Sequence, residues 1–398
     1  MAIHVPDDYV YLDWAATTPL GEEAVQAMQP FLAPGTANIA LGGNANSLHA
    51  PGRAAFEAME QARRQIAACL GASRPSEIIF TSGATEADNM ALLGIARAAA
   101  AKRRRQAKDL VPRVITTMIE HEAVGAPARQ LTKEGFDVVF LKPDRQGFIS
   151  ADELARHLDD STVLVSVQMA NSEVGSVQPI AQLAELAHAQ GALFHTDAVQ
   201  ALAKVPVHLQ SLGVDAASFA SHKVCGPKGV GALYLKARTP FEALALGGGQ
   251  EDARRSGTQN VCGIAGFAAA CQAAVSLQLD ESARQMALRD SLYERLSQLA
   301  RVKPTVNVER GSADYLPNIV HVLVDGYESE TLVLRLDAAG YGVSGGSACA
   351  SHSLEPSRVL RAMGIAGDEA YGALRISFGR YTTESDIDGF CKAFAEII

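Results

Sequence analysis

One cysteine and one lysine stand in runs whose composition favours chemistry over packing. Cys349 lies in the run GGSACAS at 345–351, where every neighbour is too small to bury it. Cysteine usually behaves as a small buried hydrophobic residue, so a thiol without apolar neighbours indicates reactivity. Lys223 lies in the run HKVCGPKG at 222–229, which predicts a rigid turn. A thiol on a flexible loop and an amine on a turn predict covalent chemistry.

Three polar features are expected where predicted strands end. The run SGATE at 82–86 separates a strand from a helix, so its backbone N–H groups and the Thr85 hydroxyl could bind an anion. An ordinary helix N-cap would have the same pattern. Asp197 follows one predicted strand and Lys223 follows the next, at the edge where α/β sheets bind ligands. An anion cradle, a carboxylate and an amine match what pyridoxal phosphate (PLP) requires: a bound phosphate, a protonated ring nitrogen and a Schiff base.

The segments that must position these residues alternate short apolar runs with helical periodicity from about residue 75. Seven strands are predicted, at 77–81, 114–118, 138–141, 163–167, 193–196, 216–219 and 231–235. The clearest helices between them span 85–105 and 179–190. Strands that alternate with helices predict an α/β sheet with crossover helices.

The pattern changes in the C-terminal part of the chain. Here the sequence predicts helices at 280–299, 328–338 and 355–363 and strands at 319–323 and 374–378. This mixture is typical of a smaller α+β domain. We expect a large domain at 15–260, and a small domain that combines 1–14 with 261–398 and carries the cysteine loop at 345–354. Since clefts between such parts commonly hold the site, we expect it there.

Composition narrows the class of protein. The 398 residues are 48% hydrophobic and 20% charged with a net charge of −9, which is typical of a soluble enzyme and argues against direct nucleic-acid binding. The six cysteines show no CxxC pair or zinc spacing, so neither a disulfide framework nor a metal site is expected. The N-terminus resembles no signal peptide, and the uncharged stretch between Arg255 and Asp280 predicts a buried Ala-rich helix rather than a membrane span. We therefore expect a cytoplasmic protein.

A series of short motifs, in order along nearly the whole chain, resembles a known family. They are YLD at 11–13 with ATTP at 16–19, FTSGATE at 80–86, EH at 120–121, NSEVG at 171–175, HTDAVQ at 195–200, HK at 222–223, RSGT at 255–258 and GSAC at 346–349. Their combination is similar to the PLP-dependent cysteine desulfurases of the NifS/IscS type, which belong to the class V aminotransferases. The resemblance implies fold type I, with a mostly parallel seven-stranded sheet in the large domain.

The resemblance also implies roles for individual residues. Lys223 would form the Schiff base, His121 would stack on the ring and move protons, and Cys349 would take up the sulfur. Arg375 would bind the substrate carboxylate, with Asn171 beside it, and is preferred over the nearby Arg380. The residues implied in cofactor binding are Ala84, Thr85, His121, Asn171, Asp197, Gln200, Ser221, His222, Lys223 and, from the second subunit of a homodimer, Thr258.

The activity implied is conversion of L-cysteine to L-alanine, with the sulfur held as a persulfide on Cys349. A protein acceptor would then use it for iron-sulfur cluster assembly or for thiolation of tRNA, DNA or cofactors. The small residues around Cys349 resemble the longer loop that goes with protein acceptors. Two alternatives stay open: a selenocysteine lyase or another class V PLP enzyme, and a non-catalytic scaffold of a sulfur-transfer system.

Three positions depart from the family pattern. Ala220 stands where a serine hydroxyl usually contacts the phosphate, and the neighbouring Ser221 is expected to take over that contact. Ser172 replaces the second Asn of an Asn-Asn-Glu motif. Cys225 stands where tyrosine is usual, and is expected as a packed small residue, with a second reactive thiol as the alternative.

Overall fold

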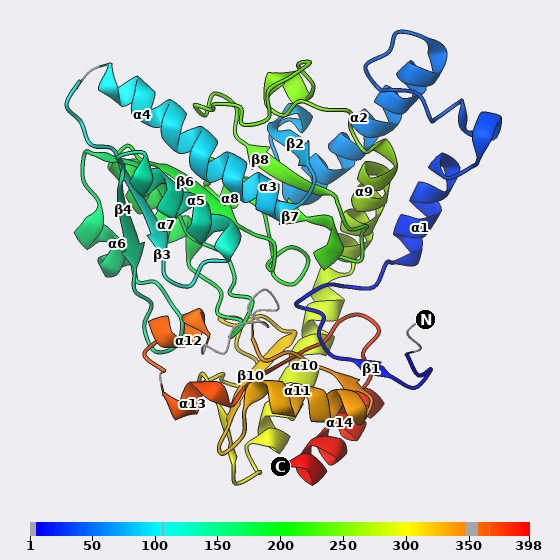
Figure 1. The fold of residues 1–398 in the computed structure, drawn as a ribbon, viewed down its shortest axis with the longest axis vertical. Coiled ribbons are helices and arrows are strands. Elements are labelled where there is room, and N and C mark those ends of the chain that lie inside the picture. Colours follow the sequence, from blue (N-terminus) through cyan, green and yellow to red (C-terminus); the bar gives the residue numbers. More distant parts are fainter. Residues whose placement is uncertain (1–4, 106, 347–356, 366) are drawn as a thin grey trace.

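The structure is a computed structural model that describes residues 5–105, 107–346, 357–365 and 367–398. A large unit holds a seven-stranded sheet, and a smaller unit with the C-terminal helices lies below it in Figure 1. The sheet order is β2-β8-β7-β6-β5-β3-β4, in which β8 runs antiparallel to both neighbours and the remaining pairs are parallel. The strands are β2 (Ile78–Thr81), β3 (Arg113–Thr117), β4 (Asp137–Leu141), β5 (Thr162–Ser166), β6 (Leu193–Asp197), β7 (Ala216–Ala220) and β8 (Gly231–Leu235). The predicted α/β sheet with seven, mostly parallel strands is confirmed.

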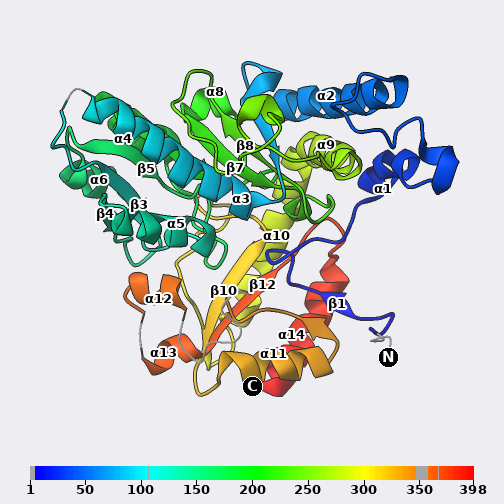
Figure 2. The same cartoon turned by 45° about the horizontal axis from the view of Figure 1, so that its top comes forward.

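Helices cover both faces of this sheet, which explains why β2, β5, β7 and β8 are buried along their whole length. One face packs against α2, α7 and α9, and the other against α3, α4 and α5. Figure 2 shows α3 and α4 running across the sheet. The helices of the large unit are α1 (Glu22–Met28), α2 (Ala50–Leu70), α3 (Ala84–Asn89), α4 (Ala96–Arg104), α5 (Glu122–Lys133), α6 (Ala151–His157), α7 (Ile180–Ala189), α8 (Leu209–Leu212) and α9 (Val261–Ser276), with short turns η1 (Gln29–Phe31), η2 (Gly35–Asn38), η3 (Pro75–Glu77), η5 (Ser221–Lys223) and η6 (Glu251–Ala253).

The helix predicted at 85–105 forms as three segments in series: α3, η4 (Met90–Ile95) and α4. The middle segment is π-helical, a form that occurs mostly as single turns inside α-helices. Gly94 lies in this segment, where a Cβ atom would come within 2.7 Å of the Phe241 ring and of the Glu242 carbonyl oxygen. Only glycine therefore fits where the π-helical turn meets the 241–242 backbone.

The smaller unit is an antiparallel sheet covered by helices around a second apolar core. Its strands are β9 (Val302–Pro304), β10 (Ile319–Val324) and β12 (Ala373–Ser377), in the order β12-β10-β9. Its helices are α10 (Gln278–Leu296), α11 (Ser329–Ala338), α12 (Arg358–Ala362), α13 (Asp368–Tyr371) and α14 (Glu384–Ile397). The N-terminal strand β1 (Val10–Tyr11) pairs in parallel with β11 (Tyr341–Gly342), which places the start of the chain in this unit. The strands predicted at 319–323 and 374–378 are confirmed.

The uncharged stretch after Arg255 forms α9, and its predicted burial is confirmed. Ile264, Phe267 and Cys271 are buried in the apolar cluster that also underlies the large sheet. The predicted domain boundary at 260/261 stays a prediction, although this packing joins α9 to the core of the large unit. Within the described ranges no single helix is long and apolar enough to cross a membrane, while α9 and α10 meet that test only as a pair bent by 68°.

A buried ion pair fastens α2 to the segment that precedes α9. The Arg63 guanidinium donates to both carboxylate oxygens of Glu251, at 2.6 and 3.0 Å, and also to the Ile78 carbonyl at 2.6 Å. The backbone N–H of Phe80 donates to the same Glu251 carboxylate at 3.0 Å. Both charged side chains are buried, and Glu251 depends on Arg63 for compensation of its charge, while Arg63 Nε also donates to the partly exposed Glu60 carboxylate at 2.8 Å.

Removal of one partner from this pair is expected to destabilise the protein. Glu251→Ala leaves the buried Arg63 guanidinium with only the partly exposed Glu60 as counter-charge and leaves the Phe80 N–H without its acceptor, which should lower the free energy of unfolding by about 3 kcal/mol in urea titrations. The matched control is Glu57→Ala, which breaks the exposed pair between Arg64 and Glu57 on the same helix and should cost at most about 1 kcal/mol. Equal losses in the two variants would contradict the structural role given to Glu251.

Candidate functional site

A cavity of about 480 Å³ opens between the two units, where the carboxyl ends of the parallel strands face β12. This volume is in the range of small-molecule sites. Of the residues predicted for the site, those that line the cavity are Ala84, Thr85, His121, Asp197, Gln200, His222, Lys223 and Arg375. Residues that are far apart in the sequence therefore converge on one space, as expected from their places at strand ends.

Lys223 lies on η5, the turn that directly follows β7. Its Nζ donates to the carbonyl oxygens of Ala15 and Ala16, at 2.5 and 2.7 Å. Burial lowers the pKa of Lys223 to about 7, and the positive charges of Arg375 and Lys204 act in the same direction. A large fraction of the amine is therefore unprotonated near neutral pH, which is the form that attacks a carbonyl carbon.

Asp197 ends β6 and is one of two buried carboxyl groups at the base of the cavity. Burial raises the pKa of Asp197, while the backbone N–H of Val199, which donates to its carboxylate at 2.9 Å, lowers it. The second carboxyl group belongs to Asp88 on α3, and burial together with the charge of Asp197 raises its pKa well above the usual value. We infer that Asp197 holds the negative charge and that Asp88 stays neutral. A carboxylate at this place can pair with a protonated ring nitrogen.

The turn between β2 and α3 forms a concave backbone surface in the cavity wall. Gly83 is the N-cap of α3, and no described side chain caps the first amide groups of the helix. Behind it, a Cβ atom on Gly231 would lie 2.7 Å from the Gly83 carbonyl carbon, so glycine is required where β8 begins. The exposed N–H groups and the positive end of the helix are suited to an anion such as a phosphate. His222 and Lys228 line the same cavity.

His121 stands at the start of α5 and belongs to the cavity wall. Its Nδ1 accepts a hydrogen bond from the backbone N–H of Ala123 at 3.1 Å, so the ring caps the helix. In the neutral ring this leaves the proton on Nε2. This helix cap is compatible with the predicted role of His121 at the cofactor, because the cap uses Nδ1.

Arg375 reaches the cavity from β12 of the smaller unit. Its Nη2 donates to Asp13 Oδ1 at 2.7 Å and its Nη1 to the Ser172 carbonyl at 2.8 Å. Its Nε is buried and has no hydrogen-bond partner among the described residues. Arg380, the competing candidate, is instead paired with Glu23 at 2.8 Å. This arrangement favours Arg375 as the carboxylate-binding residue.

Among the predicted site residues that the structure describes, three do not line the cavity. The Asn171 amide is buried and used internally: its Oδ1 accepts from the N–H groups of Glu173 and Val174, both at 2.9 Å. Ser221 is fully buried, and its hydroxyl has no partner among the residues described. Thr258 is exposed on the surface of the large unit. Their predicted roles stay predictions.

The departures from the family pattern have structural counterparts. Ser172 contributes its carbonyl group to Arg375, a contact that any residue could make. Cys225 is buried with φ 63°, and burial raises the pKa of its thiol, which is the environment of a packed cysteine rather than a reactive one. Cys349 lies outside the described residues.

Two residues in the cavity region carry functional weight that the sequence analysis did not assign. Asp13 belongs to a recognised motif, but its contact with Arg375 joins residues more than 360 positions apart. Asp88 lies one turn into a helix, where the sequence offers no sign that its side chain points to the base of the cavity.

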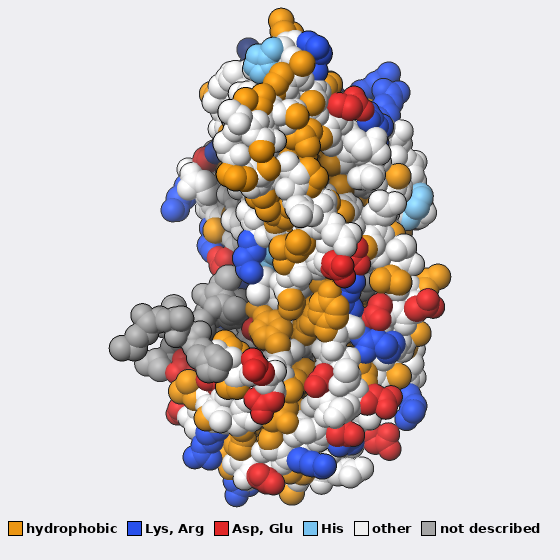
Figure 3. Space-filling model, turned by 90° about the vertical axis from the view of Figure 1, so that its right-hand side faces the viewer, with side chains coloured by type: hydrophobic (Ala, Val, Ile, Leu, Met, Phe, Trp, Pro, Cys, Tyr) orange, Lys and Arg blue, Asp and Glu red, His pale blue; other side chains and the backbone are white. Residues whose placement is uncertain are grey.

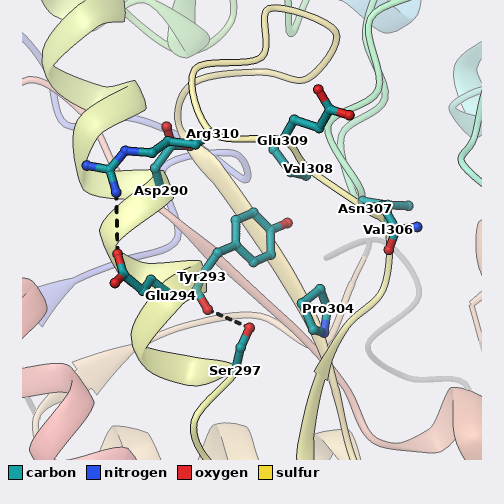
Figure 4. A pocket seen from close by; sticks show the side chains of 10 residues that line it. All are labelled: Asp290, Tyr293, Glu294, Ser297, Pro304, Val306, Asn307, Val308, Glu309 and Arg310. Carbon is teal, nitrogen blue, oxygen red and sulfur yellow. Dashed lines mark hydrogen bonds and ion pairs between the residues drawn. The ribbon is translucent and has the colours of Figure 1, made fainter.

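A second cavity, of about 440 Å³, lies in the smaller unit between α10 and the segment 304–310 (Figure 4). The ring of Tyr293 lies across it, and its charged groups pair with each other or with neighbours, as Arg310 does with Glu294 at 3.4 Å. Asp290 is likewise paired with Arg289 at 2.9 Å. None of the predicted site residues that the structure describes lies there, so the chemistry belongs to the first cavity.

The groups in the first cavity fit the functional groups of PLP. The amine of Lys223 is available for a Schiff base, and Asp197 for the ring nitrogen. The glycine cradle at Gly83 is free to take an anion. The fit to the phosphate is supported by the first amide groups of α3, which no described side chain caps, and by His222 and Lys228 in the same lining.

The whole chain is similar to proteins of one family. The family model described as aminotransferase class-V matches residues 10–390. A protein named cysteine desulfurase IscS from Dictyoglomus turgidum is 41% identical over 390 residues, which are 98% of this chain and 94% of that protein. The IscS of Klebsiella pneumoniae is 42% identical over 381 residues, 95% of this chain and 90% of its own.

Solved structures agree with this similarity. A NifS-like protein superposes with a TM-score of 0.87 at 36% sequence identity, covering 98% of this chain and 99% of its own. A structure of SspA in complex with cysteine superposes with a TM-score of 0.77 at 31% identity, and the match covers 94% of this chain and 100% of the SspA chain. The predicted fold type I of PLP-dependent transferases is confirmed.

The low pKa of Lys223 predicts a pH dependence of stability in the cofactor-free protein. Folding lowers the pKa from 10.5 to about 7, so between these values the unfolded chain binds a proton that the folded chain lacks. The contribution of Lys223 to the free energy of unfolding should therefore rise with pH between about 7 and 10.5. In urea titrations, Lys223→Met should exceed the wild type in stability at about pH 6.5, where the wild type buries a cation, and the difference should shrink towards pH 10.

The control for this measurement is the same comparison in a Lys204→Met background. Burial also lowers the pKa of Lys204, to about 8, and its charge acts on Lys223, so its own titration has to be removed from both proteins. A difference between variant and wild type that stays constant from pH 6.5 to 10 would show that folding leaves the proton affinity of the Lys223 amine unchanged.

Proposed function

Because the chain belongs to the class V aminotransferase family, we propose that it is a PLP-dependent cysteine desulfurase. It would convert L-cysteine to L-alanine and carry the sulfur as a persulfide on Cys349. The observation that carries this proposal is the convergence of Lys223, Asp197 and Arg375 on one cavity between the two units. An amine, a pyridinium partner and a carboxylate clamp in this arrangement fit an α-amino acid held on PLP.

PLP, when bound, supplies an electron sink that weakens the bonds at the α- and β-carbon atoms of the amino acid. We propose that Lys223 forms the covalent link and that Asp197 holds the ring nitrogen. The backbone of Gly83, Ala84 and Thr85, with His222, would hold the phosphate. Gln200 lines the same wall, and its Nε2 is anchored on the Ala15 carbonyl at 2.9 Å.

Proton movement falls to two side chains. Once released from its covalent role, the Lys223 amine can take the α-proton, because its low pKa leaves it unprotonated near neutral pH. His121, whose Nδ1 is occupied by the helix cap, would present Nε2 to the reacting atoms. Arg375 would orient the substrate through its carboxylate, a task that suits the planar guanidinium better than an ammonium group.

The segment that bears Cys349 begins and ends beside this cavity. On one side, the backbone of Ser344 pairs with that of Arg375, with an N···O distance of 2.7 Å from the Arg375 N–H. On the other side, the Ser357 hydroxyl donates to the Glu173 carboxylate at 2.5 Å. A Cβ atom on Gly346 would lie 3.4 Å from the same carboxylate. These anchors support the proposal that the Cys349 thiolate attacks the substrate sulfur. In that step an S–S bond forms as the C–S bond of the substrate breaks. The carbon skeleton then takes up protons to become alanine.

The proposed activity predicts equal formation of alanine and sulfide from L-cysteine in the presence of a reductant. Lys223→Ala should lose the absorbance of the bound cofactor and at least about a hundredfold in rate. Cys349→Ser should keep the cofactor absorbance and lose sulfide release to a similar extent, because no thiolate accepts the sulfur. The matched control is Cys225→Ser, whose thiol is buried and whose replacement should leave the rate within about twofold.

Other outcomes would favour other functions. A yellow protein that forms no sulfide from L-cysteine but releases selenide from selenocysteine would be a selenocysteine lyase. A protein that binds no cofactor yet retains a sulfur-transfer partner would be a scaffold. Loss of activity in Cys225→Ser but not in Cys349→Ser would move the persulfide to the other thiol.

We propose that the protein acts as a homodimer and passes its sulfur to a protein acceptor. Large apolar side chains are exposed along the segment 20–56, which forms α1, η1, η2 and α2: Leu20, Val25, Leu32, Ile39, Leu48 and Phe56. Figure 3 shows apolar side chains gathered along the upper part of this side of the molecule. The segment with Thr258 is adjacent, because Asn46 Nδ2 donates to Gln259 Oε1 at 3.1 Å. A second copy on this face would bring Thr258 to the cavity of its partner.

The dimer predicts a sensitivity to charge on this apolar face. Leu48 has 91% of its surface exposed. Replacement of Leu48 by Asp should leave a monomer stable, but should weaken association if Leu48 lies in an interface. Light scattering should give twice the mass of one chain for the wild type, and Leu48→Asp should raise the dissociation constant by about tenfold or more. Leu334→Asp, on the exposed side of α11, is the control that should stay dimeric. A monomeric wild type would refute the dimer.

A further inference from the structure

Arg375 is fixed by the protein at two of its three nitrogen atoms. Asp13 holds Nη2 and the Ser172 carbonyl holds Nη1, while Nε has no hydrogen-bond partner in the described parts of the chain. The residue is only 2% exposed, so bulk solvent has little access to this donor. A buried guanidinium donor that is left open at a cavity wall points to a ligand that accepts from it.

Asp13 is itself held rigidly against the same strand. The Ser377 N–H donates to the Leu12 carbonyl at 2.8 Å, and the Trp14 N–H donates to the Ser377 carbonyl at 3.3 Å. Residues 375 and 377 are two apart on β12, so their side chains lie on the same face of the sheet. The Tyr11 hydroxyl further donates to the Asp13 carbonyl at 2.9 Å. The carboxylate of Asp13 is therefore placed by backbone pairing on both sides.

We propose that Asp13 is the positioning residue of the substrate-carboxylate site. This inference rests on the function proposed above, and it assigns to Asp13 the orientation of Arg375 rather than a contact with substrate. By holding Nη2, Asp13 stops the guanidinium from turning about its long side chain and keeps Nε open to the ligand. The charge of Asp13 repels a bound carboxylate, so charge alone would weaken binding. Its favourable effect has to come from position.

Two conservative variants separate position from charge. Asp13→Asn keeps an oxygen acceptor at the same place and removes the charge, whereas Asp13→Glu keeps the charge and moves the carboxylate by one methylene group. If position matters, Asp13→Asn should bind a carboxylate ligand nearly as well as the wild type, and Asp13→Glu should bind it worse. If only charge matters, Asp13→Asn should bind it more tightly than the wild type and Asp13→Glu should match the wild type, because the charge of residue 13 repels the carboxylate.

The experiment titrates the holoprotein with L-alanine and with ethylamine, which share an amine and differ in the carboxylate. Binding is followed through the absorbance of the bound cofactor. We expect Asp13→Asn to hold L-alanine within about threefold of the wild type and Asp13→Glu to lose about tenfold or more, with ethylamine unchanged in both. Glu23→Gln, which alters the neighbouring pair with Arg380, is the matched control and should change neither ligand.

Three results would overturn the inference. They are L-alanine binding in Asp13→Glu that matches the wild type, equal losses for L-alanine and ethylamine, and a wild type that binds L-alanine no better than ethylamine. The proposed function fails separately: a wild type that forms no sulfide from L-cysteine, yet binds L-alanine with the expected dependence on residue 13, would retain the carboxylate site without the desulfurase reaction.

Discussion

The contact between the Lys223 amine and the carbonyl oxygens of Ala15 and Ala16 ties the chemistry to the architecture. The acceptors belong to a segment that leaves β1 in the smaller unit and enters the cavity of the larger one. The same segment holds Arg375 through Asp13. One short stretch of backbone thus sets the amine and the guanidinium relative to each other, across two units with separate cores.

Desolvation determines which groups in the cavity carry charge. Burial weakens the protonated form of Lys223 and the ionised forms of Asp88 and Asp197, so neutral forms dominate except where a partner compensates. Backbone donation from Val199 gives Asp197 that compensation, whereas the hydrogen bond from Ser218 to Asp88 does not offset the burial of Asp88. The result is an unprotonated nucleophile beside the carboxylate of Asp197.

The local sequence pattern was sufficient to predict the residues at the strand ends, but not the directions of the other side chains. The carboxyl ends of parallel strands meet at one edge of the sheet, so the placement of Asp197 and Lys223 could be predicted from spacing alone. Arg375 rested on its match to the family. The directions of the side chains could not be predicted. The Asn171 side chain turns into its own loop because of hydrogen bonds that form only in the folded chain, and the Ser221 side chain turns into the interior through packing. The contact of Asp13 with Arg375 joins opposite ends of the sequence, where no periodicity applies.

The crossing segment at the start of the chain has a consequence for how the protein can be altered. Residues near a terminus are usually the most expendable, and are the first to be trimmed or joined to a fusion partner. Here Tyr11, Asp13, Ala15 and Thr18 each hold a part of the catalytic region, since Thr18 binds the backbone of His222 and Cys225. A cut within this stretch would remove supports of both units at once.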